Sequence, residues 1–174
     1  MDTDPDVGAL AKVGDRWELR FSRLLAHPPA KVWRAITEPE HLRAWFPADI
    51  EGERAAGAKL RFPFRHDEGP TLDGEMLVYD EPRVLALRWG DEDIRIELTP
   101  EGNGCRLVFV NTFDELGKAA RDAAGWHVCL DRLRALLDGG EPPADDAWKP
   151  LNRRYIELLG PEASTIGPPD GAVT

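Results

Sequence analysis

The sequence predicts an α+β domain, and three observations support this fold class. Apolar residues recur at every second position in short runs across residues 48–113, which is the period of strands with one solvent-facing side. The spacing changes to three and four over residues 116–137, which predicts one long amphipathic helix. The strands are grouped apart from this helix, an order that favours α+β architecture. The helix is therefore expected to cover one face of an antiparallel sheet.

The N-terminal half begins with a strand at residues 16–26, where Trp17, Leu19 and Phe21 alternate with polar residues. Pro29 suits the first turn of a short helix that follows this strand. A second short helix is expected after Thr37, which could cap it, and it should end before residue 47. Two small helices should therefore follow the first strand.

The central region predicts an antiparallel meander, with strands near residues 60–64, 74–79, 85–89, 94–98 and 107–113. Within the second of these, Met76 and Val78 are expected on one face and Tyr79 on the other. Gly139 is well placed to end the long helix. A shorter helix is expected at about residues 145–159, with Trp148 and Tyr155 on one side.

Length and charge limit the classes of protein. A chain of 174 residues suggests one domain that buries about 70 % of its unfolded surface. With 32 acidic against 22 basic residues, nucleic acid and anionic membrane surfaces are disfavoured partners. No stretch approaches the ~20 apolar residues of a membrane span, and the acidic N-terminus lacks the features of a signal peptide. A cytoplasmic protein is expected, with no membrane insertion.

The expected organisation is a flexible segment at residues 1–15, one domain at 16–160 and a flexible tail at 161–174. Cys105 and Cys129 lie far apart among apolar residues and are interpreted as reduced core cysteines. The four histidines do not fall at zinc-ligand spacings, so no metal and no cofactor are expected.

Three segments carry a resemblance to a known family. They are residues 28–47 (PPAKVWRAITEPEHLRAWFP), the pair 74–78 and 82–89 (GEMLV and PRVLALRW), and residues 125–133 (GWHVCLDRL). In this order, they resemble the START-like SRPBCC superfamily, and most closely the proteins related to the C-terminal domain of the activator of heat-shock protein 90 ATPase. The resemblance covers about residues 16–160. It implies a helix-grip fold, a curved antiparallel sheet wrapped around a long C-terminal α-helix with two short helices after the first strand.

The resemblance also implies an apolar cavity between the sheet and the long helix. Its walls would come from inward strand positions and the helix stripe: Trp45, Phe62, Phe64, Met76, Trp89, Ile96, Phe109, Trp126 and Leu130. Small-molecule pockets are mostly apolar with a few polar groups that fix orientation. The alternative interpretation is that these side chains pack against one another and leave no cavity.

Two polar residues complete the candidate site. Asn111 has inward parity between two phenylalanines, and a buried amide requires hydrogen-bond partners. His127 lies at the edge of the helix stripe, where it is either a boundary residue or, if it faces the cavity, a proton carrier. The loop at residues 66–68 and the acidic turn at 91–93 are interpreted as solvated. Arg23 interrupts the apolar pattern of the first strand and is expected to pair with a helix acid.

The prediction for function is binding of a small hydrophobic molecule, such as a lipid, a polyketide or a similar aromatic metabolite. One alternative is a polyketide cyclase or aromatase, which would need an acid or base in the cavity, with His127 and Asn111 as the first candidates. Another is a co-chaperone-like module for a heat-shock ATPase partner. Nucleophile-elbow and phosphate-loop motifs are absent from the sequence, which disfavours a nucleophilic hydrolase. The last helix covers either its own core or a second copy in a homodimer.

Overall fold

A computed structural model describes residues 4–64 and 70–167 of the chain. Seven strands form one antiparallel sheet in the order β1-β2-β7-β6-β5-β4-β3. The elements are β1 (Ala9–Val13), β2 (Arg16–Leu25), α1 (Pro29–Thr37), α2 (Pro39–Trp45), β3 (Lys59–Phe62), β4 (Leu72–Asp80), β5 (Val84–Trp89), β6 (Glu92–Glu101), β7 (Gly104–Phe113), the 3-10 turn η2 (Leu116–Lys118), α3 (Ala119–Asp138), α4 (Trp148–Leu159) and the 3-10 turn η3 (Pro161–Ser164). This is the predicted α+β class.

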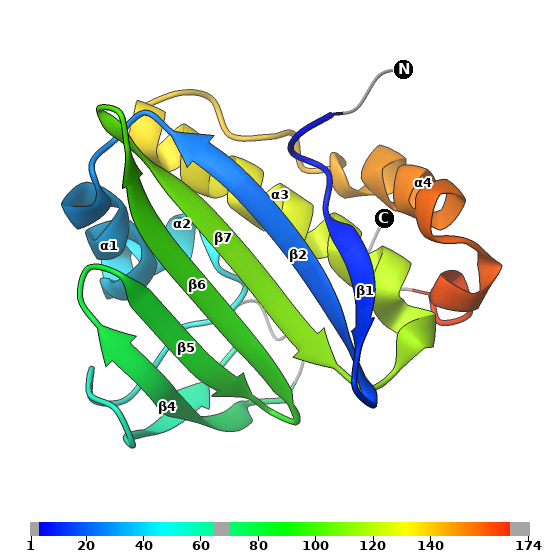
Figure 1. Ribbon diagram of the computed structural model, residues 1–174, viewed down its shortest axis with the longest axis horizontal. Helices are drawn as coiled ribbons and strands as arrows, with labels where there is room; N and C mark the ends of the chain where they lie inside the picture. Colours follow the sequence, from blue (N-terminus) through cyan, green and yellow to red (C-terminus); the bar gives the residue numbers. More distant parts are fainter. Residues whose placement is uncertain (1–3, 65–69, 168–174) are drawn as a thin grey trace.

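The sheet curves around the long helix α3, as Figure 1 shows, and this confirms the expected helix-grip arrangement. The short helices α1 and α2 lie behind the sheet toward β5 and β6, and α4 lies beyond the edge strand β1 (Figure 1). Gly139 ends α3 in the left-handed conformation, with φ of 68°. The buried face of the sheet, α3 and the short helices enclose one apolar core.

The edge strand β1 falls inside residues 1–15, the segment expected to be flexible. It pairs antiparallel with β2, with Leu10 opposite Leu19. Most of its side chains are exposed, so its sequence lacks the alternation that marks a strand with one buried face. At the other end, the backbone N–H of Ile166 donates to the carbonyl of Gly117, 3.0 Å away. Both ends of the described chain therefore contact the domain.

A β-bulge in β4 changes which side chains reach the buried face. The register shifts between Met76 and Val78, so that Met76 lies opposite Leu87 and Tyr79 opposite Leu85. The alternation that put Val78 on the face of Met76, with Tyr79 on the other, was therefore wrong beyond the bulge. An extra residue in one strand reverses the parity of all that follow it.

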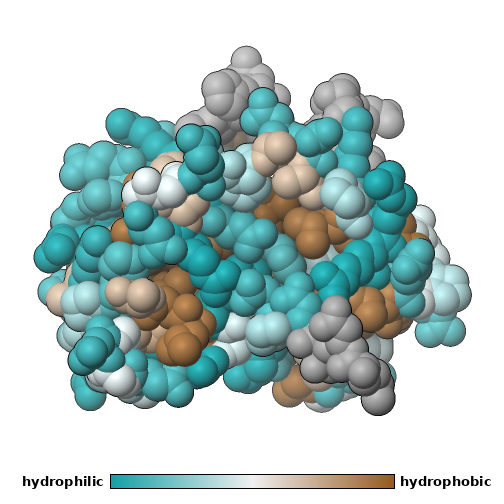
Figure 2. All heavy atoms as spheres, turned by 90° about the horizontal axis from the view of Figure 1, so that it is seen from above, coloured by the Kyte–Doolittle hydropathy of each residue, from teal (hydrophilic) through white to brown (hydrophobic). Residues whose placement is uncertain are grey.

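Hydrophilic side chains dominate the face seen in Figure 2, where apolar atoms form small, separate patches. The large apolar side chains exposed among the described residues are Val13, Leu24, Ile156 and Leu158. Within residues 4–64 and 70–167, none of the helices has the length and apolar character needed to cross a membrane.

Candidate functional site

Six aromatic rings meet between the sheet and α3, and we call them the aromatic cluster: Phe46, Phe62, Phe64, Trp89, Phe109 and Trp126. Trp89 lies at its centre, with ring centroids 4.8 Å from Phe62 and 5.6 Å from Phe64. Trp126 of α3 lies 6.2 Å from Trp89 and 4.8 Å from Phe109. Side chains from β3, β5, β7 and α3 thus converge on one region.

Five of these six rings were predicted as wall residues, and the structure brings them together. They meet in edge-to-face or tilted geometry and contact one another directly. Trp45 adjoins the cluster through Phe46, with centroids 5.2 Å apart, and its indole N–H donates to the carbonyl of Ala35. The remaining predicted wall residues are buried in the same core: Met76, Ile96 and Leu130.

Phe46 is a cluster member that the sequence reasoning missed. It follows the last residue of α2, and its ring contacts both Trp89, at 5.3 Å, and Trp126, at 5.8 Å. The sequence does place Phe46 directly after Trp45, a predicted wall residue, and this was the available sign that it could lie inside. A residue just outside a short helix has no periodic pattern, however, so the direction of its side chain could not be read from spacing.

The absence of a side chain at Gly74 leaves room for the ring of Phe62 and the backbone of β5. Gly74 lies opposite Trp89 in the register. A Cβ at this position would lie 2.6 Å from the ring of Phe62 and 1.9 Å from the carbonyl oxygen of Arg88. Only glycine fits here without displacing backbone.

Asn111 follows the cluster member Phe109 by two residues on β7, and its side chain is incompletely bonded. Its amide nitrogen donates to Glu92 Oε1 at 3.0 Å and lies 3.4 Å from the carbonyl of Asp93. Its Oδ1 is buried and has no hydrogen-bond partner. An unsatisfied buried acceptor costs about 1–3 kcal/mol, so this oxygen is a position where a donor would stabilise the protein.

Glu92 links Asn111 to α3. Its carboxylate forms a close ion pair with Lys118, whose Nζ also lies 3.6 Å from Asp122. Burial alone lowers the pKa of Lys118, but the hydrogen bond and charge of Glu92 outweigh it and raise the pKa. The sequence analysis interpreted residues 91–93 as a solvated turn, whereas Glu92 begins β6 opposite Trp89. Three consecutive acids gave no signal that one of them points inward.

His127 contacts a different part of the interior. Its Nδ1 lies 2.8 Å from the hydroxyl of Tyr155, which also accepts the backbone N–H of Gly8 at 2.8 Å. The other ring nitrogen, Nε2, lies 3.6 Å from the carboxylate of Asp131. Burial lowers the pKa of His127. The ring also packs edge-on against Phe21.

Arg23 belongs to the same buried network. Its side chain is 1 % exposed and donates to Asp131 Oδ1 at 2.7 Å and to the carbonyl of Asp6 at 3.2 Å. This confirms the expected ion pair with a helix acid. Asp6 also pairs with Arg134 at 2.8 Å, which holds the pKa of that carboxyl below its ordinary value. The network therefore fastens the N-terminal segment to α3.

Metal-ligating side chains come together at one surface position. Glu38, Glu40 and His41 each offer a ligand atom within 4.8 Å of the others, and all are at least partly exposed. The candidate loop at residues 66–68 lies outside the described residues. Cys105 and Cys129 are buried, reduced thiols, as expected.

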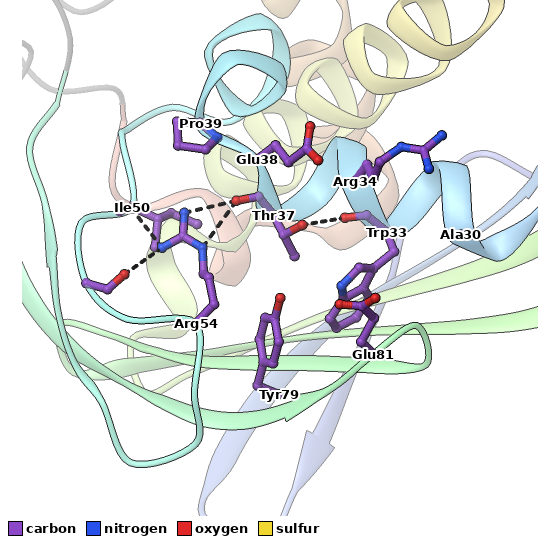
Figure 3. Close-up of a pocket in the computed structure, with 11 residues that line it drawn as sticks. Ala30, Trp33, Arg34, Thr37, Glu38, Pro39, Ile50, Arg54, Tyr79 and Glu81 are labelled. Atoms are coloured by element: carbon purple, nitrogen blue, oxygen red, sulfur yellow. Dashed lines mark hydrogen bonds between the residues drawn. The ribbon is translucent and has the colours of Figure 1, made fainter.

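An open pocket of about 580 Å³ lies apart from the aromatic cluster, beneath α1. Figure 3 shows side chains from α1, from the segment around Arg54 and from the end of β4 surrounding it. None of the predicted wall residues lines this pocket. Its most buried aromatic residue is Trp33 of α1.

Comparisons with known proteins agree with this architecture. The family model of the Activator of Hsp90 ATPase homolog 1-like proteins matches residues 26–138. EF2215 from Enterococcus faecalis, a conserved protein of unknown function, is 22 % identical with a TM-score of 0.75, over 87 % of this chain and 90 % of its own. CalU16 from Micromonospora echinospora is 19 % identical with a TM-score of 0.69, over 88 % and 96 %.

A third similar structure is that of a protein from a biosynthetic locus. DynU16, a protein in the dynemicin biosynthetic locus, is 23 % identical with a TM-score of 0.63, over 72 % of this chain and 48 % of its own. No curated protein matches the chain. The family model spans well over half of the sequence, and the fold of the solved structures is the same. The chain therefore belongs to the family of Activator of Hsp90 ATPase homolog 1-like proteins.

Proposed function

We propose that this protein binds a small hydrophobic molecule carrying a hydroxyl group, between the sheet and α3. Lipids, polyketides and similar aromatic metabolites have this chemistry. The observation that carries the proposal is the unpaired Oδ1 of Asn111, which is buried on β7 two residues after the cluster member Phe109. A ligand hydroxyl would supply the donor that the protein itself does not.

The aromatic cluster supplies the apolar surface for such a ligand. Trp89 and Trp126 are each 8 % exposed, and Phe64 is half-buried, so the cluster reaches the protein surface. Aromatic rings present large apolar faces, and stacked or edge-on contacts contribute about 0.5–1.5 kcal/mol beyond burial. A flat apolar ligand would replace ring–ring contacts with ring–ligand contacts of the same kind.

Entry of the ligand requires that rings move, because the cluster is closed by its own contacts. Phe64 is the best placed to move, since its ring packs edge-on against Trp89 and its side chain is already partly exposed. Rotation of this ring would uncover the face of Trp89. The ligand hydroxyl would then approach Asn111 along β6, where Glu92 lies opposite Trp89.

Binding is favoured over cyclase chemistry by the position of His127. Its ring nitrogens face Tyr155 and Asp131, and its pKa is lowered by burial. Its hydrogen bonds thus connect it to the N-terminal segment and α4 rather than to Asn111. The presence of the structural relative DynU16 in a biosynthetic locus is in keeping with a small-molecule ligand.

The test compares two probes that differ by one hydroxyl, naphthol and naphthalene. We expect naphthol to raise the melting temperature and quench tryptophan fluorescence in a saturable way, and to bind more tightly than naphthalene. In Asn111→Leu, which keeps the branched shape of the side chain and removes the acceptor, the two probes should bind equally. Trp126→Phe should lose part of the quenching, whereas the control Trp148→Phe, on α4, should keep it.

Two results would refute the proposal. One is the absence of any saturable response to either probe in the wild-type protein. The other is a preference for naphthol that survives unchanged in Asn111→Leu. Far-UV circular dichroism checks that the variant is folded, and Trp126→Phe provides an independent test if it is not.

A further inference from the structure

We propose that the pocket beneath α1 is a second ligand site, which binds a small planar molecule through a carbonyl or carboxylate oxygen. Its volume of about 580 Å³ lies within the range of about 300–1,000 Å³ that is usual for small-molecule sites. Its walls come from α1, the segment Ile50–Arg54 and the end of β4. None of these residues belongs to the aromatic cluster, so this site is independent of the one proposed above.

An unpaired hydrogen-bond donor lines this pocket. Trp33 is 3 % exposed, and its indole N–H is buried without a partner. The other two indoles whose bonds the structure shows, Trp45 and Trp148, donate to the carbonyls of Ala35 and Arg121. An indole N–H is a donor only, so what it lacks is an acceptor oxygen. The ligand must therefore bring one.

Tyr79 provides a flat apolar wall beside this donor. The rings of Trp33 and Tyr79 lie 5.2 Å apart in edge-to-face geometry, and Figure 3 shows them side by side, one from α1 and one from β4. Tyr79 faces Trp33 because the bulge in β4 turns it to the buried side of the sheet. Ile50 and Pro39 extend the apolar lining. Such a surface suits a planar ring.

Arg54 adds positive charge to the lining of the pocket. Its guanidinium donates to the carbonyls of Thr37, Ile50 and Gly52 at 2.9–3.2 Å, and among the described residues no carboxylate pairs with it. Burial lowers the pKa of Arg54, which shows that its charge is partly removed from water. A partly desolvated cation held on backbone carbonyls favours an oxygen acceptor nearby.

Access to the indole N–H requires a side chain at the mouth to move. Glu81 is exposed and Tyr79 is partly exposed, so either can move without opening the core. Glu38 also lines the pocket and pairs with His41 at 3.3 Å. The charged side chains that line the pocket are two arginines and two acids: Arg34, Arg54, Glu38 and Glu81. Because the two signs balance, the ligand oxygen can belong to a neutral amide or to a carboxylate.

The experiment follows the indole N–H signals of the intact protein by NMR after tryptophan labelling with nitrogen-15. Trp33→Phe identifies the signal of Trp33 and keeps most of the ring. We expect benzamide or benzoate to shift this signal saturably and to leave those of Trp45 and Trp148 unchanged. In Trp33→Phe, the affinity measured by calorimetry should fall about fivefold, the contribution of one hydrogen bond. The control Trp17→Phe should bind as the wild type does.

Three probes separate the outcomes. A response to benzamide alone identifies a neutral carbonyl ligand, and a response to benzoate identifies a carboxylate; either supports the site. The proposal is overturned if neither probe shifts the Trp33 signal, or if toluene, which has no acceptor, shifts it equally. Signals of Trp89 and Trp126 report on the aromatic cluster in the same spectra, so failure of one site is distinguished from failure of the other.

Discussion

Replacing Trp126 by alanine tests whether the aromatic cluster is packed core or the wall of an open cavity. Its indole contacts the rings of Phe46, Trp89 and Phe109 at centroid distances of 4.8–6.2 Å, and only 8 % of the residue is exposed. Because three packed rings surround this side chain, they cannot move far enough to fill the cavity that its removal would leave. We therefore expect a loss of about 3–5 kcal/mol in the free energy of unfolding, the usual cost of truncating a packed tryptophan.

The measurement is urea denaturation followed by far-UV circular dichroism, with the slope of the transition compared between variants. Trp148→Ala is the matched control. Trp148 lies on α4, is partly exposed and donates a hydrogen bond of 3.3 Å, so its removal should cost less than that of Trp126. A loss below about 2 kcal/mol for Trp126→Ala, with an unchanged slope, would refute the packed cluster and indicate an open cavity.

Two further predictions concern the buried network around Arg23. Asp131→Ala removes the nearest carboxylate from the 1 %-exposed guanidinium of Arg23. The carbonyl of Asp6 and its more distant carboxylate, 3.6 Å from Nε, remain, and the change should lower the free energy of unfolding by about 3 kcal/mol in urea denaturation. Arg23→Met removes the charge itself and should cost less; an equal or larger cost would contradict this reasoning. The second prediction is that stability depends on pH through His127. Burial lowers the pKa of His127 in the folded protein; the charges of Asp131 and Asp6 raise this pKa, whereas the charge of Arg23 lowers it further. As the pH falls, His127 in the unfolded chain takes up a proton near its ordinary pKa of 6.5, whereas in the folded protein it does so only at lower pH. The free energy of unfolding should therefore be highest above that pH and decrease as the pH falls below it. Urea midpoints between about pH 8 and pH 5 should show this decrease in the wild type, and a slope that persists undiminished in His127→Gln would exclude this histidine as its cause.

The layered fold could be predicted from the sequence because its signals are local. Alternation of apolar residues along each strand and the stripe on α3 depend on the backbone periods of two and 3.6 residues. The aromatic residues could be assigned to inward positions on the same basis. Five of the six cluster members, including Trp89 and Trp126, were found in this way. The buried ion pair of Arg23 followed from the one break in its strand's pattern.

Positions that depend on pairing could not be predicted. Tyr79 reaches Trp33 only because a bulge reverses the parity of β4, and a bulge is a property of two strands together. Glu92 is one of three consecutive acids, and only the register of β5 and β6 shows that it lies opposite Trp89. The edge strand β1 exists because β2 offers unpaired backbone groups, although its own side chains carry little apolar pattern.

By itself, the sequence determined the class of fold, the order of its elements from β2 onward and five of the six members of the aromatic cluster, because these depend on periodicity along one chain. The tertiary structure alone decided which buried polar atoms are paired. It bonded His127 to Tyr155, and it left Asn111 Oδ1 and the indole N–H of Trp33 without partners. Hydrogen bonding is directional and short in range, so it depends on distances between distant segments that spacing along the chain does not contain.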